Sequence, residues 1–166
     1  MAKKKHQAEG KQETRSTFMF PRLHKKVLNA VSGEIQPTWF SKKGSNYKFT
    51  QEYSTYVMGK FTCGNNACSR AGWSSKKVAI NIRRYPNNGY NAVVFNQRCE
   101  YCDRLGTLTL DEKSYVERMS YRLRRWAGIP TEEQHYTQKE GLPHKSELCE
   151  GCKRGYCQEV KFQRLD

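Results

Sequence analysis

Three short clusters of cysteines constrain this chain more than any other feature. They are CGNNAC, CEYC and CEGCKRGYC, which contain Cys63 and Cys68, Cys99 and Cys102, and Cys149, Cys152 and Cys157. Seven cysteines cannot pair completely into disulfides. Pairs of cysteines on short turns are typical of structural zinc sites, in which four Cys or His ligands surround the ion as a tetrahedron. The sequence therefore predicts zinc sites instead of a disulfide framework.

One histidine completes the ligand count for two zinc ions. His144 lies five residues before Cys149, so His144, Cys149, Cys152 and Cys157 form a candidate Cys₃His site. The first two clusters supply Cys63, Cys68, Cys99 and Cys102 for a Cys₄ site. His135 is the competing histidine, and the spacing also allows the middle cluster to share an ion with the last one. We expect two Zn²⁺ ions whichever pairing holds.

The ligand sets favour a structural role for the metal over a catalytic one. A catalytic zinc keeps one coordination position open for water, whereas four protein ligands close the site. The sequence has no H-E-x-x-H motif, and no glutamate stands in the position that the zinc deaminase signature requires. We therefore expect a chain that is not an enzyme.

The composition indicates a thin hydrophobic core. Only 36% of the 166 residues are hydrophobic, and mean hydropathy is −0.94. Small cores are commonly supplemented by bound metal. No apolar run approaches the length of a membrane span, and the charged start MAKKKHQAEG lacks the apolar region of a signal peptide. We expect no membrane span, a cytoplasmic or nuclear location, a disordered basic tail over residues 1–16 and a zinc-binding domain over 17–160.

Sequence periodicity predicts a small α+β fold. Leu23, Val27 and Val31 recur every four residues between Pro21 and Gly33, which indicates a short amphipathic helix. Strands are predicted over 56–63, 78–84 and 90–97, and the sequence PNNG marks a turn between the last two. The clearest helix covers 111–128 and is expected to begin with a capping box at Thr109 and Glu112. The expected architecture is an antiparallel sheet of about three strands, with an N-terminal helix and one longer helix between the metal clusters.

The net charge of +14 indicates a polyanionic partner, and the basic residues are concentrated in the first half of the chain. Cationic side chains occur close to aromatic residues, a mixture that suits RNA because it combines phosphate contacts with base stacking. The predicted nucleic-acid-binding residues are Lys76, Lys77, Arg83, Arg84, Arg98 and Tyr85. Trp73 and Tyr90 lie nearby in the sequence, although a thin core could equally bury these rings.

A second basic feature lies in the long predicted helix. Arg118, Arg122 and Arg125 recur along one side of it and could follow a phosphate backbone, while a solvated charged face is the commoner meaning of such a pattern.

Several motifs together resemble a known family. FTCGNNAC, GWSS, YNAVVFNQRCEYC, SYVERMSYRLRRWAG and PHKSELCEGCKRGYC are similar to the 3CxxC-type zinc-binding domain, especially as it occurs in fungal proteins. The wider family includes receptor-transporting proteins and zygote arrest proteins, whose zinc region binds RNA. The first pair departs from the pattern, because CGNNAC is longer than C-x-x-C. The resemblance implies zinc binding with either RNA binding or a role as a protein-interaction adaptor or trafficking cofactor that holds a protein client.

Overall fold

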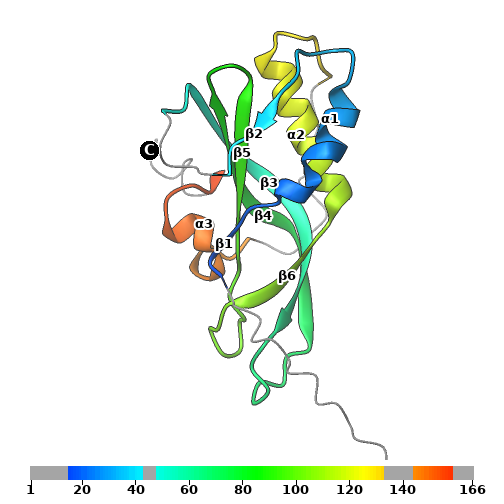
Figure 1. Ribbon diagram of the computed structural model, residues 1–166. Helices are drawn as coiled ribbons and strands as arrows, with labels where there is room; N and C mark the ends of the chain where they lie inside the picture. The colour runs from blue at the N-terminus through cyan, green and yellow to red at the C-terminus, as the bar shows by residue number, and fades with distance from the viewer. Residues whose placement is uncertain (1–14, 43–47, 133–143, 159–166) are drawn as a thin grey trace, which may run out of the picture.

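The computed structural model describes residues 15–42, 48–132 and 144–158. Its central feature is a mixed, mostly antiparallel sheet of six strands in the order β1-β5-β4-β3-β6, with β2 also paired to β5 (Figure 1). The strands are β1 (Thr17–Phe18), β2 (Trp39–Phe40), β3 (Gln51–Cys63), β4 (Gly72–Tyr85), β5 (Gly89–Phe95) and β6 (Gly106–Leu110). The helices are the 3₁₀ turn η1 (Pro21–Leu23), α1 (His24–Val31), α2 (Glu112–Trp126), the 3₁₀ turn η2 (Ser146–Leu148) and α3 (Glu150–Lys153).

Strands β3 and β4 form a long antiparallel hairpin with one irregularity in the middle. Pairing shifts between Val57 and Gly59 of β3, where Met58 alone stands opposite Lys76 and Lys77 of β4. Such a bulge places an extra residue on one strand and bends the ladder. Both lysines are exposed at this point.

The main core lies between one face of the sheet and helices α1 and α2. Alternation along β4 turns Val78, Ile80 and Ile82 toward these helices, and each of the three is fully buried. Val27 of α1 and Met119 of α2 belong to the same cluster. Figure 1 shows α1 and α2 side by side on this face, with α3 on the opposite face.

The opposite face of the sheet is covered by the segment that contains the last cysteine cluster. Ala79 and Phe95 pack there with Cys149, Cys152 and Cys157 in a second buried cluster. Gly151 makes the close approach of α3 feasible, since a Cβ at this position would lie 2.7 Å from the Ala79 Cβ.

The predicted α+β class and the N-terminal helix are confirmed, and the strand number is corrected from about three to six. Thr109, which was predicted to cap the long helix, instead lies in β6, and this strand pairs with β3. The predicted cap is therefore wrong. Asp111 is the N-cap of α2, and its carboxylate accepts a hydrogen bond from the Ser114 N–H.

The predicted tail falls largely outside the described residues, which also exclude His135, the competing histidine. Residues 15 and 16 already contact the domain, because their carbonyl oxygens accept hydrogen bonds from the side chain and backbone of Asn96. Within the described ranges, no helix has both the length and the apolar character needed to cross a membrane.

Candidate metal centres

The first candidate centre lies at the end of the β3–β4 hairpin. Its four ligands come from the end of β3, from the loop after it and from the turn between β5 and β6; they are Cys63, Cys68, Cys99 and Cys102. Hydrogen bonds shape both turns. The Cys68 N–H donates to the Asn65 carbonyl, and Asp103, in a left-handed conformation with φ of 60°, donates to the Cys99 carbonyl at 2.8 Å. The longer CGNNAC loop therefore still brings both of its sulfur atoms to one point.

The second candidate centre lies on the face of the sheet opposite α1 and α2. It joins His144, Cys149, Cys152 and Cys157, of which the three cysteines are buried. Cys149 is the N-cap of α3, and its sulfur accepts a hydrogen bond from the Cys152 N–H at 3.4 Å. The Tyr56 ring borders the site, with its centroid 5.9 Å from that of the His144 ring.

Both clusters have dimensions that suit a zinc ion. With Zn–S bonds of about 2.3 Å, tetrahedral geometry places neighbouring sulfur atoms about 3.8 Å apart. The Cys68 and Cys99 sulfur atoms are 3.8 Å apart, and those of Cys63 and Cys102 are 3.5 Å apart. In the second centre, His144 Nε2 lies 3.3 Å from the Cys152 sulfur. Each cluster can therefore hold one zinc ion with four protein ligands. The first two cysteine clusters lie together in one site, and the last cluster lies with His144 in the other, which is the first of the two pairings considered from the sequence.

The two centres are joined through the segment that follows β5. Gln97 forms a β-bridge with Cys149, and the Arg98 N–H donates to the Leu148 carbonyl at 2.8 Å. The Arg98 side chain donates to Glu150 at 2.7 Å, and this carboxylate is 8% exposed. Glu100, between the two ligands of CEYC, pairs with Lys145, the neighbour of His144. Residues next to the ligands of the first centre are thus held by backbone and ion-pair contacts to the segment that supplies the ligands of the second.

The protonation of the ligands reflects their crowding. Burial lowers the pKa of His144, but hydrogen bonds to the Cys152 and Cys157 sulfurs outweigh it and raise this pKa to about 9. The Arg104 backbone N–H lowers the pKa of Cys102 to about 7 against the opposing effect of burial. The neighbouring thiols raise the pKa of Cys149. Zinc binding must therefore release protons from both centres, because the metal requires thiolates and a neutral imidazole.

The structure does not gather the predicted nucleic-acid-binding residues into one surface. Arg83 pairs with Glu52 at 3.0 Å and lies against the Phe49 ring, and Arg98 is occupied by Glu150 as described above. Tyr85 is only 1% exposed, so its ring is covered in this structure and offers no surface on which a base could stack. Lys76 and Lys77 remain exposed at the β-bulge.

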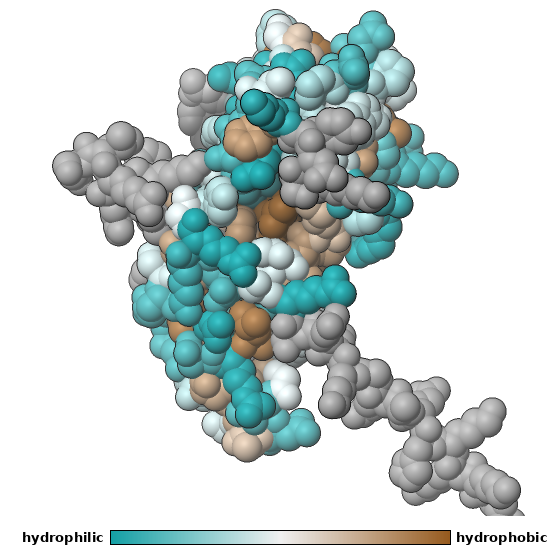
Figure 2. Space-filling model, turned by 60° about the vertical axis from the view of Figure 1, so that its left-hand side comes forward, coloured by the Kyte–Doolittle hydropathy of each residue, from teal (hydrophilic) through white to brown (hydrophobic). Residues whose placement is uncertain are grey.

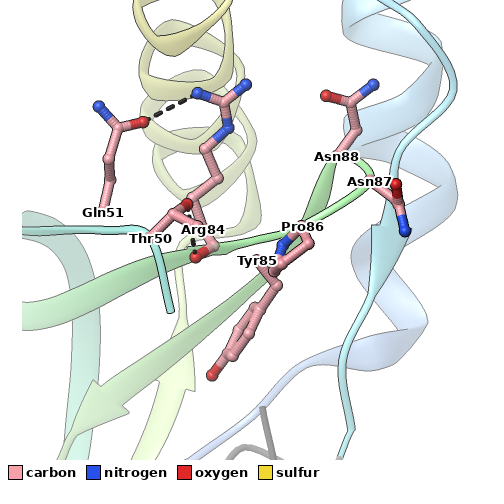
Figure 3. Close-up of a pocket in the computed structure, with 7 residues that line it drawn as sticks. All are labelled: Thr50, Gln51, Arg84, Tyr85, Pro86, Asn87 and Asn88. Atoms are coloured by element: carbon pink, nitrogen blue, oxygen red, sulfur yellow. Dashed lines mark hydrogen bonds between the residues drawn. The ribbon is translucent and has the colours of Figure 1, made fainter. Parts of the chain in front are cut away.

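Figure 3 shows the surroundings of Arg84 and Tyr85 at the β4–β5 turn. Thr50, Gln51, Arg84, Tyr85, Pro86, Asn87 and Asn88 line a shallow depression of about 470 Å³. Arg84 extends to Gln51 Oε1 at 2.9 Å and to the Trp126 carbonyl at the end of α2, whereas the Tyr85 ring points away in the opposite direction. Tyr85 accepts a hydrogen bond from Asn91 at its hydroxyl and packs beside Trp39.

Sequence reasoning missed two exposed residues near the first centre. Lys60 of β3 is exposed on the same side of the sheet as Lys76, since β3 and β4 alternate in step on either side of the bulge. Tyr101, between the ligands Cys99 and Cys102, is 67% exposed. A side chain that projects from a metal-binding turn has few neighbours to cover it, and this was the available signal for Tyr101.

Comparison with known proteins agrees with this geometry. Residues 56–155, more than half of the chain, match a family model described as a zinc-binding domain of the 3CxxC zinc-ribbon type. This range begins in β3 and contains all eight ligands except Cys157. Comparison with curated proteins and with solved structures returns no match. The matched range and the two four-ligand clusters show that the chain belongs to the family of 3CxxC-type zinc-binding domains.

Proposed function

We propose that this domain is a non-enzymatic module that binds single-stranded nucleic acid, RNA in particular, through the exposed face of β6, β3 and β4. This surface, the outer lysine face, consists of Met58, Lys60, Thr62, Ser74, Lys76, Lys77, Thr107 and Thr109. Because side chains alternate between the two faces of a sheet, these residues lie on the face away from the core residues Phe61 and Leu108. The face is mostly polar, and Thr62 is the neighbour of Cys63 in the first metal centre.

The observation that carries the proposal is the unbalanced charge of this face. The strand segments 58–62, 72–77 and 106–110 contain three lysines and no acidic residue. Lys60 and Lys76 form no ion pair within the described part of the chain. Lysines without carboxylate partners are available for phosphate groups, and contact with phosphates releases counterions from the nucleic acid.

Tyr101 supplies the exposed ring that Tyr85 does not. It lies at the metal-binding turn, where the Arg70 guanidinium is 5.3 Å from its ring centroid and 5.1 Å from that of Trp73. Stacking of one base on such a ring contributes about 1–3 kcal/mol. The structure offers less support for a protein-binding adaptor, because the apolar side of α1 is buried against the sheet. On the side that Figure 2 shows, hydrophobic residues form small separate areas within a mostly hydrophilic surface.

The test is the salt dependence of binding to a fluorescent single-stranded RNA of 20 uridines. We expect affinity to fall steeply as salt rises, and the double variant Lys60→Gln/Lys76→Gln to reduce the slope of log affinity against log salt by about 1.4, since each phosphate contact to a single strand contributes about 0.7. The double variant Lys25→Gln/Lys113→Gln removes the same charge from α1 and α2 and serves as the matched control. No binding at low salt, or equal effects of the two double variants, would overturn the proposal. Protein partners that persist after nuclease treatment of a purified complex would favour the adaptor.

A further inference from the structure

A second group of cations lies on α2, away from the outer lysine face. Arg118, Arg122 and Arg125 project from one side of this helix, and Arg84 reaches the end of the helix from β4 through its bond to the Trp126 carbonyl. Three aromatic residues lie among these guanidinium groups: Tyr53, Tyr121 and Trp126. We call this group the arginine–aromatic cluster.

The contacts within the cluster are close and include few carboxylates. The Arg122 guanidinium lies 3.3 Å from the Tyr53 ring centroid and 5.9 Å from that of Trp126. Arg122 and Arg125 are each 5.9 Å from the Tyr121 ring centroid. Neither of these two arginines forms an ion pair among the described residues. The charge is therefore balanced by ring faces, which attract cations more weakly than a carboxylate does.

Two further observations concern the buried donors and the desolvated charges of this cluster. The Nε atom of Arg122 is buried and has no hydrogen-bond acceptor within the described ranges. Burial lowers the pKa values of Arg118 and Arg122, which means that their positive charges are partly desolvated. A buried donor without an acceptor is unfavourable, and partly desolvated charges of like sign repel one another. A phosphate group bound by Arg122 and Arg125 would offset this repulsion, because guanidinium groups bind phosphate through paired hydrogen bonds.

We propose that the arginine–aromatic cluster binds a nucleotide unit, with its phosphate at Arg122 and Arg125 and its base against Tyr121. The half-exposed Tyr121 ring has its centroid 5.9 Å from both guanidinium groups, so a phosphate held by the two arginines leaves an attached base within reach of the ring. Arg84 extends the positive charge toward the depression at the β4–β5 turn. This site is independent of the outer lysine face, which lies on the other side of the sheet.

The test is isothermal titration calorimetry of the zinc-loaded, full-length chain. Adenosine 5′-monophosphate, adenosine and inorganic phosphate are titrated separately. We expect the monophosphate to bind at least tenfold more tightly than either of the others. The double variant Arg122→Gln/Arg125→Gln should weaken it at least tenfold, and Lys113→Gln, on the same helix, should change it less than twofold. Arg125 is exposed, so the single variant Arg125→Gln provides the same comparison, with a smaller loss, if the double variant does not fold.

Further measurements distinguish a strand end from a free nucleotide as the ligand. They also distinguish this proposal from the proposed RNA binding at the outer lysine face. The oligonucleotide measurement uses the Lys60→Gln/Lys76→Gln variant, in which the outer lysine face is weakened. A 5′-phosphorylated oligonucleotide that binds this variant more tightly than both the monophosphate and the same oligonucleotide without its 5′-phosphate identifies a strand end as the ligand, and tighter binding of the monophosphate identifies a free nucleotide. Lys60→Gln/Lys76→Gln should leave binding of the monophosphate intact, so failure of RNA binding at the outer lysine face does not affect this result. The inference is overturned if the monophosphate does not bind, if adenosine or inorganic phosphate binds equally well, if phosphotyrosine binds as tightly, or if the arginine variants bind normally.

Discussion

The Glu150 carboxylate is almost fully shielded from solvent and lies between the two metal centres. Arg98 is its main partner, with Lys153 farther away at 3.7 Å. Removal of one member of a buried ion pair leaves the other charge uncompensated, whereas removal of both can be almost neutral. Arg98 was predicted from sequence to contact nucleic acid, and in the structure its guanidinium pairs with Glu150 and donates to the Asp103 carbonyl.

We expect Arg98→Met to lower the free energy of unfolding by about 3 kcal/mol, the lower end of the range for buried pairs, because Arg98 is partly exposed and Lys153 remains. The double variant Arg98→Met/Glu150→Met should recover most of this loss. Chemical denaturation of the zinc-loaded protein measures both. If the loss in the double variant equals the sum of the losses in Arg98→Met and Glu150→Met measured separately, the pair is not coupled. RNA binding by folded Arg98→Met should match the wild type.

Helix α2 begins at a cap that sequence reasoning placed two residues too early. Asp111→Ala removes the carboxylate that accepts the Ser114 N–H, and we expect a loss of about 1 kcal/mol in the free energy of unfolding. Thr109, the predicted cap, is an exposed residue of β6. Thr109→Ala is therefore the matched control, and a larger loss in this variant than in Asp111→Ala would show that the capping box predicted from the sequence operates in solution.

The elements with clear periodicity were predictable, and those defined by pairing were not. Leu23, Val27 and Val31 predicted the N-terminal helix, and the alternation of Val78, Ile80 and Ile82 predicted β4. The two-residue strands β1 and β2 exist only because β5 offers an edge, which no local pattern encodes. The metal ligands were predictable because cysteine clusters have few other uses, whereas the burial of Tyr85 depends on Trp39, a residue far away in the sequence.

At the scale of the whole molecule, the metal centres replace part of the core. The cluster on the face opposite α1 and α2 is built largely of the ligands Cys149, Cys152 and Cys157, so its packing depends on their convergence. A structural zinc contributes about 10–16 kcal/mol of apparent binding free energy, which equals or exceeds the total stability of about 5–15 kcal/mol of a typical domain. We expect chelation of both ions to unfold the chain, measured as loss of near-ultraviolet circular dichroism and its return when zinc is added. A native spectrum in chelator would contradict this.

Retention of zinc should depend steeply on pH. Cysteine thiols have a pKa of about 8.5 in an unfolded chain, so most of them carry a proton at neutral pH when the metal is absent. The folded arrangement also favours the protonated ligands, because it raises the pKa of His144 to about 9 and raises that of Cys149. Metal binding must displace these protons, so a fall in pH strengthens the competition and weakens zinc affinity, by up to tenfold per pH unit for each proton released. Competition with a chromophoric chelator at pH 6, 7 and 8 measures the dependence. In His144→Cys, a thiol replaces the imidazole, and the second centre should still bind one ion with a changed pH dependence. An affinity that does not vary between pH 6 and 8 would show that the ligands are already deprotonated before the metal arrives.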